Sequence, residues 1–258
     1  MIDVKNVSKS YKLSRKQRKE MGSDFIGDSV LAVDNISFSC QSGRIFGLIG
    51  PNGAGKTSTL RMIGTMLAPS SGGILVNNFD TVTDSQSVKK SLGFLSGNTG
   101  LYDRLTAEEM VRYYADLHEM TEANFQKSRN RLFRLLDMEE FSGRRIGKLS
   151  TGMMQKVNIA RTMIHEPEVV VFDEPTSGLD VMASRSIIQL IKECGDEGKT
   201  VIFSSHRLAE IQSLCDDLAI IHKGELYFNG TYEEFEYQKQ EATLEDEFIR
   251  MVGEGEHV

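Results

Sequence analysis

The sequence predicts an α/β fold: a core with a mixed or parallel sheet, an antiparallel β portion at the N-terminus and an inserted α-helical lobe. Three observations predict it. Apolar residues alternate at 2–7 and again at 30–40, as they do in strands. From about 100 to 165 the apolar spacing becomes helical. From 168 to 221 short apolar runs alternate with helical segments, which is the order of a layered α/β core.

Composition limits the possible functions. The chain has 258 residues, 40% of them hydrophobic, which is enough for one sizeable core with an inserted lobe. Its formal charge of −7 argues against nucleic acid as a partner, because that affinity depends on neutralising phosphates. Its three cysteines are too scattered for a disulfide framework or a zinc site. No run reaches the roughly 18 apolar residues of a membrane span, and the first residues do not resemble a signal peptide. Any action on a membrane is therefore expected to need another chain.

Between the first two predicted strands lies a basic run followed by a polar segment at 21–28. We interpret this stretch as a solvated loop or short exposed helix, or alternatively as a surface for a partner or for anionic lipid headgroups. The basic residues are Lys12, Arg15, Lys16, Arg18 and Lys19.

The apolar run at 44–49 ends in a glycine-rich segment that directs the functional prediction. This segment matches the pattern G-x-x-x-x-G-K-[ST] and reads Gly50-Pro51-Asn52-Gly53-Ala54-Gly55-Lys56-Thr57. Its glycines let backbone N–H groups point at an anion, Lys56 reaches the outer phosphates, and the Thr57 hydroxyl can bind Mg²⁺. A helix predicted from Thr57 through Ser58 to about Leu67 directs its positive end at the same phosphates. A chance match is disfavoured because the strand, loop and helix appear in the required order.

Beyond this helix, we expect Gly72 and Gly73 to form a turn into a short strand at 74–76, with a buried strand at 92–95. Thr106 and Glu109 form a capping-box pattern that starts a helix ending near 118. Another helix is indicated near 132–136. A third begins near Ser150, where one face carries Met153, Val157, Ala160 and Ile164.

The run at 168–172 is apolar enough to be a strand buried on both sides, and it ends in two acidic residues. Ligands of open α/β sheets bind at this end of the strands. Asp173 is suited to holding Mg²⁺ through water, and Glu174 to polarising an attacking water as a general base. The alternative is two acids that only begin a loop. A helix at 182–194, a strand at 200–203, a helix after Arg207 and a strand at 218–221 continue the alternation.

Two motifs give a specific resemblance. Leu149-Ser150-Thr151-Gly152-Met153 precedes Asp173-Glu174-Pro175-Thr176-Ser177-Gly178-Leu179-Asp180, and together they resemble the signature motif and D-loop of ATP-binding cassette (ABC) ATPases. The resemblance extends from Tyr11 to about Gly230. We therefore expect an ABC ATPase domain at 1–231, with the helical lobe at about 100–165. The charged residues and apolar spacing of 232–258 indicate a loosely helical tail, which Leu244, Phe248 and Met251 or Val252 can dock on the core.

The resemblance also implies a head-to-tail dimer, in which each ATP lies between the P-loop of one subunit and the signature loop of the other. Ser150, Gly152 and Asp180 are then expected to contact nucleotide. Ser150 at a helix N-terminus supports this physically, although it can also be only a helix cap.

His206 matches the histidine that contacts the γ-phosphate in this family and orders the base and its water. Tyr11 matches the aromatic residue that stacks on adenine, with simple packing as the alternative. We expect the other histidines to be surface or packing residues; they are His118, His165, His222 and His257.

Two departures from the family pattern stand out. The usual Gly-Gly-Gln of the signature is Thr151-Gly152-Met153, which keeps the second glycine. The glutamine that normally helps bind Mg²⁺ and senses the transmembrane partner is replaced by Gly97, so that Ser96, Asn98 or water has to substitute for it.

We therefore predict that the chain is the ATP-hydrolysing subunit of an ABC exporter, with ATP and Mg²⁺ as its cofactors. Its expected partners are a second copy and an ABC-2 type transmembrane permease, at the cytoplasmic face of the cell membrane. The segment 96–106, the signature and the basic run resemble sodium-extruding members. The alternative is a soluble ABC ATPase that acts on ribosomes or nucleic acid. A nucleotide sensor without hydrolysis is disfavoured because Glu174 and His206 are both present.

Overall fold

The computed structural model describes residues 1–14, 16, 18, 27–96 and 100–254. Gly97 and Asn98, at the position of the missing glutamine, lie outside the described residues. Arg15 and Lys19 of the basic run also lie outside them.

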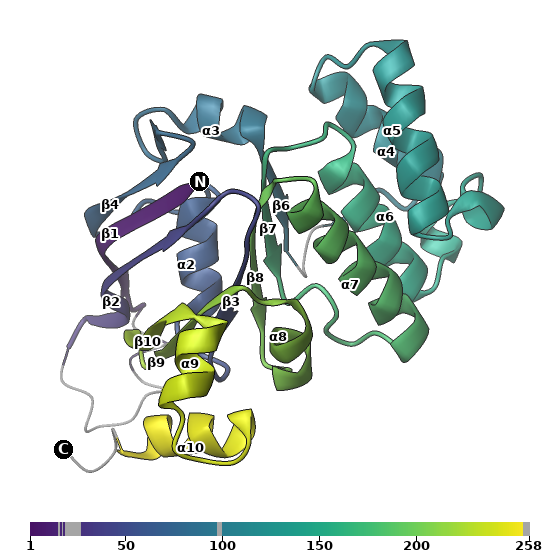
Figure 1. Ribbon diagram of the computed structural model, residues 1–258. Helices are drawn as coiled ribbons and strands as arrows, with labels where there is room; N and C mark the ends of the chain where they lie inside the picture. The colour runs from purple at the N-terminus through teal and green to yellow at the C-terminus, as the bar shows by residue number, and fades with distance from the viewer. Residues whose placement is uncertain (15, 17, 19–26, 97–99, 255–258) are drawn as a thin grey trace.

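Two sheets form the larger part of the molecule (Figure 1). The antiparallel sheet has the order β2-β1-β4-β5 and is made of β2 (Ser29–Cys40), β1 (Ile2–Lys12), β4 (Ser71–Val76) and β5 (Phe79–Asp80). The central sheet has the order β10-β9-β3-β8-β7-β6 and is parallel except where β10 pairs with β9. Its strands are β10 (Glu225–Thr231), β9 (Asp217–His222), β3 (Ile45–Ile49), β8 (Thr200–Ser205), β7 (Val169–Asp173) and β6 (Leu92–Leu95). The predicted mixed sheet with an antiparallel N-terminal portion is therefore confirmed.

Helices cover the sheets and build the lobe. Helix α2 (Lys56–Ile63) contacts strands of both sheets, and α3 (Ser85–Ser91) lies near β5 and β6. The lobe contains α4 (Ala107–Leu117), α5 (Glu122–Leu135) and α6 (Thr151–Met163), which stand at one side of the central sheet in Figure 1. The remaining helices are α7 (Val181–Asp196), α8 (Leu208–Leu214), α9 (Tyr232–Gln238) and α10 (Leu244–Glu254).

Two predicted boundaries were wrong. Helix α2 ends at Ile63 instead of continuing to Leu67, because Thr65 adopts φ 60, which a right-handed helix excludes. Gly72 belongs to β4 rather than to a turn before it. Its φ is 79, and a Cβ there would lie 2.2 Å from the Asn6 carbonyl oxygen, so only glycine fits this irregular pairing with β1. Helix α3 and strand β10 were not predicted.

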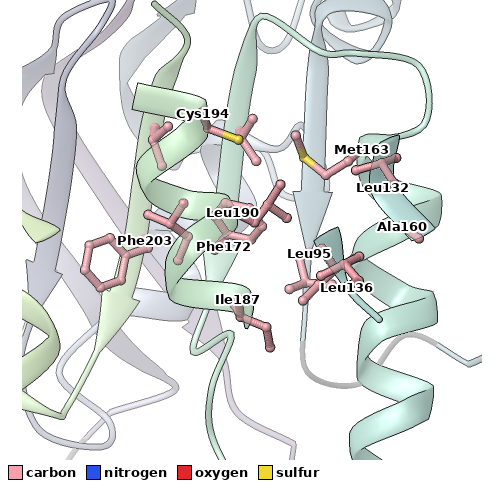
Figure 2. Close-up of a cluster of buried hydrophobic side chains, with 14 of the residues drawn as sticks. Leu95, Leu132, Leu136, Ala160, Met163, Phe172, Ile187, Leu190, Cys194 and Phe203 are labelled. Carbon is pink, nitrogen blue, oxygen red and sulfur yellow. The ribbon is translucent and has the colours of Figure 1, made fainter. Parts of the chain in front are cut away.

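A single buried cluster fixes the lobe against the central sheet (Figure 2). Leu95 of β6, Phe172 of β7 and Phe203 of β8 meet side chains of α5, α6 and α7. Burying one such side chain contributes about 1.5–3 kcal/mol. Helix α6, which Ser150 caps, therefore packs against β6, the neighbour of the strand that ends in Asp173.

The C-terminal tail lies against the same core. Leu244 at the start of α10 is buried in the cluster, and Phe248 and Met251 pack against it. Over the described part of the chain, no helix combines the length and the apolar character that crossing a bilayer requires.

Two of the histidines expected to be packing residues form a stacked pair. The rings of His118 and His165 lie 8° from parallel with centroids 3.7 Å apart. Burial, together with the nearby His118, lowers the pKa of His165 from 6.5 to about 4. Between these two pH values, His165 is therefore neutral in the folded chain but protonated in the unfolded chain.

This shift predicts a loss of stability in acid. The pKa of the folded state lies below that of the unfolded state, so the contribution is fully present above pH 6.5 and is lost as the pH falls toward 4. We expect about 2–3 kcal/mol less unfolding free energy at the lower pH from this group alone. His165→Phe keeps a ring that cannot be protonated and should flatten this part of the profile, measured by urea unfolding. An unchanged slope would contradict the assignment.

Candidate functional site

The loop between β3 and α2 is shaped for an anion. Gly50 is required by close approach, because a Cβ there would lie 2.2 Å from the Ile221 carbonyl oxygen. Gly55 caps α2 in a left-handed conformation with φ 111, which favours glycine, and the N-terminus of the helix that follows is the end that attracts anions. Lys56 is 5% exposed, and its Nζ donates to the carbonyl oxygens of Gly50 at 2.6 Å and Pro51 at 3.1 Å. The ammonium is thus held inside the loop, where an anion would meet it.

The acidic end of β7 lies beside this loop. The Thr57 hydroxyl donates to Asp173 Oδ1 at 3.1 Å, and the Ser204 hydroxyl donates to the same oxygen at 2.8 Å. Ser204 also accepts a hydrogen bond from the Glu174 backbone N–H at 3.0 Å. Ser204 was not among the predicted site residues. Strand β8 contains two further hydroxyl residues, Thr200 and Ser205, so the sequence does not distinguish Ser204; its partners follow from its pairing with Asp173 in the parallel sheet.

Glu174 lies between two nitrogen-bearing side chains. Its Oε1 is 3.7 Å from Lys56 Nζ, and its Oε2 is 3.4 Å from His206 Nδ1. Glu174 has φ 48, and a left-handed conformation of a non-glycine residue is a strained state that clusters at functional sites. Burial lowers the pKa of Lys56, while the charge of Glu174 acts in the opposite direction. The carboxylate is therefore held near the mouth of the loop.

A hollow of about 440 Å³ opens over these groups. Two of its lining residues, Arg61 of α2 and Gln155 of α6, were not predicted to belong to the site. Gln155 Nε2 donates to the Pro175 carbonyl at 3.0 Å and so connects the signature helix to the loop after Glu174. The hollow is lined by Asn52, Thr57, Arg61, Ser96, Thr151, Gln155, Asp173, Glu174, Ser177 and Leu179. Ser96, one proposed substitute for the missing glutamine, is among them.

Tyr11 lies next to the first turn of α2, the helix that follows the glycine-rich loop. Its hydroxyl is 3.1 Å from Ser58 Oγ on α2, and the ring is half-buried with Lys9 Nζ 5.5 Å from its centroid. Tyr11 therefore lies beside the helix that follows the phosphate-binding loop.

Three predicted residues lie elsewhere. Ser150, Gly152 and Asp180 line a separate hollow of about 510 Å³ between the signature helix and α7. Ser150 Oγ accepts from Met153 N at 3.3 Å, and Asp180 Oδ1 accepts from Ala183 N at 2.8 Å, so each caps a helix. Within one copy, the residues predicted to contact nucleotide thus form two groups.

Comparisons with known proteins agree with this geometry. The family profile described as "ABC transporter" matches residues 33–177. The chain is 43% identical over 205 residues to the ABC transporter ATP-binding protein NatA of Bacillus subtilis, covering 79% of this chain and 83% of that protein. It is 34% identical to the linearmycin resistance ATP-binding protein LnrL of the same organism, covering 77% of this chain and 64% of LnrL.

Solved structures give the same result. An ATP-binding subunit of an ABC transporter superposes with a TM-score of 0.83 at 25% identity, covering 97% of this chain and 99% of that one. The dimeric ATP-binding cassette MJ0796, solved in a post-hydrolysis state with ADP and Pi, superposes with a TM-score of 0.77 at 25% identity over 90% of this chain and 98% of that chain. The chain therefore belongs to the ABC transporter family and is an ATP-binding, ATP-hydrolysing cassette of that family.

Proposed function

We propose that residues 1–231 form the ATPase domain of an exporter and 232–258 its tail, with ATP bound at the loop 50–58. The observation that carries the proposal is Glu174 held between Lys56 and His206. Glu174 is the general base, and His206 orients it and the γ-phosphate. Thr57 and Asp173 hold Mg²⁺, since hydroxyl and carboxylate oxygens are ligands that this ion prefers. Tyr11 stacks on adenine.

We also propose that the second hollow serves the nucleotide of a second copy in a head-to-tail dimer. Ser150 uses its oxygen to cap the helix, which leaves the hydroxyl hydrogen free to be donated to a phosphate. Beside it, Val181 is 83% exposed and Met182 is 72% exposed. Apolar side chains this exposed next to a polar hollow are typical of a surface that another subunit covers. The dimeric structures of the MJ0796 cassette support the arrangement.

The membrane partner in this proposal is an ABC-2 type permease, which holds the ATPase at the cytoplasmic face of the membrane. The aromatic surface of the lobe, defined here as Tyr102, Tyr113 and Leu117, is suited to docking it. These side chains are 58%, 43% and 61% exposed, and the two tyrosine rings meet edge to face at 6.1 Å. Exposed tyrosines are enriched at protein interfaces. Tyr102 also closely follows the segment that senses the permease in this family.

Replacing the two tyrosines tests this partner. We expect Tyr102→Ala combined with Tyr113→Ala to reduce co-purification of the permease from membranes about tenfold or more, because buried interface tyrosines are often hot spots. Tyr237→Ala is the matched control, since Tyr237 on α9 is 91% exposed and lies outside the aromatic surface. Equal recovery of the permease with both proteins would contradict the docking surface.

From the family resemblance, we propose that the exporter transports Na⁺. The test compares ATP turnover of the co-purified complex in NaCl and in KCl at equal ionic strength, and stimulation by Na⁺ alone is expected. Stimulation by linearmycin instead would indicate a drug exporter, which the similarity to LnrL makes the second candidate. Turnover that responds to ribosomes rather than to either cargo would favour the soluble alternative.

A further inference from the structure

Helix α8 carries a buried carboxylate that the proposed mechanism does not use. Glu210 is 7% exposed and receives three side-chain hydrogen bonds. Its Oε1 accepts from Thr176 Oγ1 at 2.6 Å and, more weakly, from Arg207 Nη1 at 3.4 Å. Its Oε2 accepts from Ser205 Oγ at 2.8 Å. A carboxylate this buried is costly unless such partners satisfy both oxygens.

The partners of Glu210 come from the two loops that carry the proposed base and its histidine. Thr176 follows Glu174 by two residues, and Ser205 immediately precedes His206. Glu174 Oε2 and His206 Nδ1 are themselves 3.4 Å apart. One carboxylate therefore holds a chain segment on each side of this pair, although it touches neither member.

We infer that Glu210 is a positioning residue that keeps the Glu174 loop and the His206 loop in register. The inference rests on the proposed roles of Glu174 and His206. A displacement of about 1 Å in a positioned group can reduce turnover roughly 100-fold. On the Glu174 side the loop is also held by the bond between Ser204 and the Glu174 backbone and by that between Gln155 and the Pro175 carbonyl, but neither of these bonds reaches the His206 loop. Glu210 thus acts on the rate through its neighbours, while the phosphate-binding loop does not depend on it.

Glu210→Gln is the first variant to test. The amide keeps one oxygen acceptor and replaces the other with NH₂, which cannot accept from a hydroxyl. We expect kcat for ATP hydrolysis by the full chain to fall about 10–100-fold. The Kd for ATP, measured with a fluorescent analogue and by competition with ATP, should stay within about twofold, because the side-chain hydrogen bonds of Glu210 go to Thr176, Ser205 and Arg207 and not to the loop 50–58. A purely structural role would not lower kcat while leaving the Kd unchanged.

Thr176→Val tests whether Glu210 acts through its loop partners. Valine has nearly the shape of threonine and removes only the bond on the Glu174 side. If the two residues act as a unit, the double variant Glu210→Gln with Thr176→Val should turn over no more slowly than Glu210→Gln alone. Thr176→Val also decides the matter if Glu210→Gln does not fold: a fall in its kcat supports the inference, and a parental rate overturns it.

Glu247→Gln provides the matched control. Glu247 on α10 is another buried carboxylate that joins chain segments, accepting from the backbone N–H groups of Gln240 and Glu241 and from Arg250. It lies in the C-terminal helix, away from the lobe (Figure 1). We expect a lower thermal midpoint for this variant with kcat unchanged.

The inference is overturned if Glu210→Gln behaves like the control, with a lower midpoint and kcat within twofold of the parent. Multiplying effects of Glu210→Gln and Thr176→Val would also overturn it. Failure of the proposed function can be told apart from failure of this inference. It would appear as parental turnover in Glu174→Gln, independently of the result for Glu210→Gln.

Discussion

Glu174→Gln is expected to stop ATP turnover while leaving ATP binding in place. The amide has almost the same shape as the carboxylate, but it cannot accept a proton from the attacking water. General base catalysis contributes about 10²–10⁴-fold, so kcat should fall by roughly 10³ or more. With hydrolysis blocked, ATP should hold two copies together, and the protein should elute as a dimer in size-exclusion chromatography with ATP. Phosphate release and the ATP Kd are measured on the same samples.

Glu166→Gln is the matched control for this prediction. Glu166 has φ 52, close to the φ of 48 at Glu174, and it also contacts a polar partner, accepting from Ser128 Oγ at 2.7 Å. It precedes β7, at the opposite end of the strand from Glu174, and should leave turnover unchanged. Parental kcat in Glu174→Gln would refute its role as the base. A matching loss in Glu166→Gln would mean that the glutamine change acts through folding instead.

Local patterns in the sequence were sufficient for most of the fold. The P-loop, the capping box at Thr106, the cap at Ser150 and the acidic end of β7 each depend on neighbouring residues, so the sequence predicts them directly. The order of these elements then predicts a layered α/β core, which the structure confirms. The ends of helices are harder to predict. Helix α2 ends before Thr65, which adopts a left-handed conformation that the local sequence does not indicate.

Contacts across the sheet could not be predicted in this way. Ser204 meets Asp173 because β7 and β8 pair in parallel in one register, and a shift of one residue would separate them. Glu210 of α8 meets Thr176 across a gap of 34 positions in the sequence, and this contact likewise depends on how distant elements pack. Ser150 and Asp180 could be assigned to the nucleotide only through the family resemblance, since within one copy they line a different hollow from Lys56.

Lys56→Ala is expected to weaken nucleotide binding severely. In the structure the ammonium donates to two carbonyl oxygens of its own loop, and burial lowers its pKa. A triphosphate offers it stronger, charged acceptors in the same place, and each such hydrogen bond is worth about 1.5–3 kcal/mol. Losing contacts to the outer phosphates should weaken ATP binding by about 100-fold or more. The Kd for ATP, measured by isothermal titration calorimetry, checks this.

Loss of binding must be separated from loss of folding, and ligand-dependent stability does so. ATP at one hundred times the parent's Kd should raise the unfolding free energy of the parent by about 2.7 kcal/mol, but that of Lys56→Ala by only about 0.4 kcal/mol or less. Lys199→Ala is the matched control, since its ammonium also lies 3.7 Å from a carboxylate, that of Glu197, but at the opposite end of the central sheet. This control should keep the full ATP-dependent rise. Because the rise is measured against each protein's own stability without ATP, a rise in Lys56→Ala equal to the parent's would place the phosphates somewhere other than this loop.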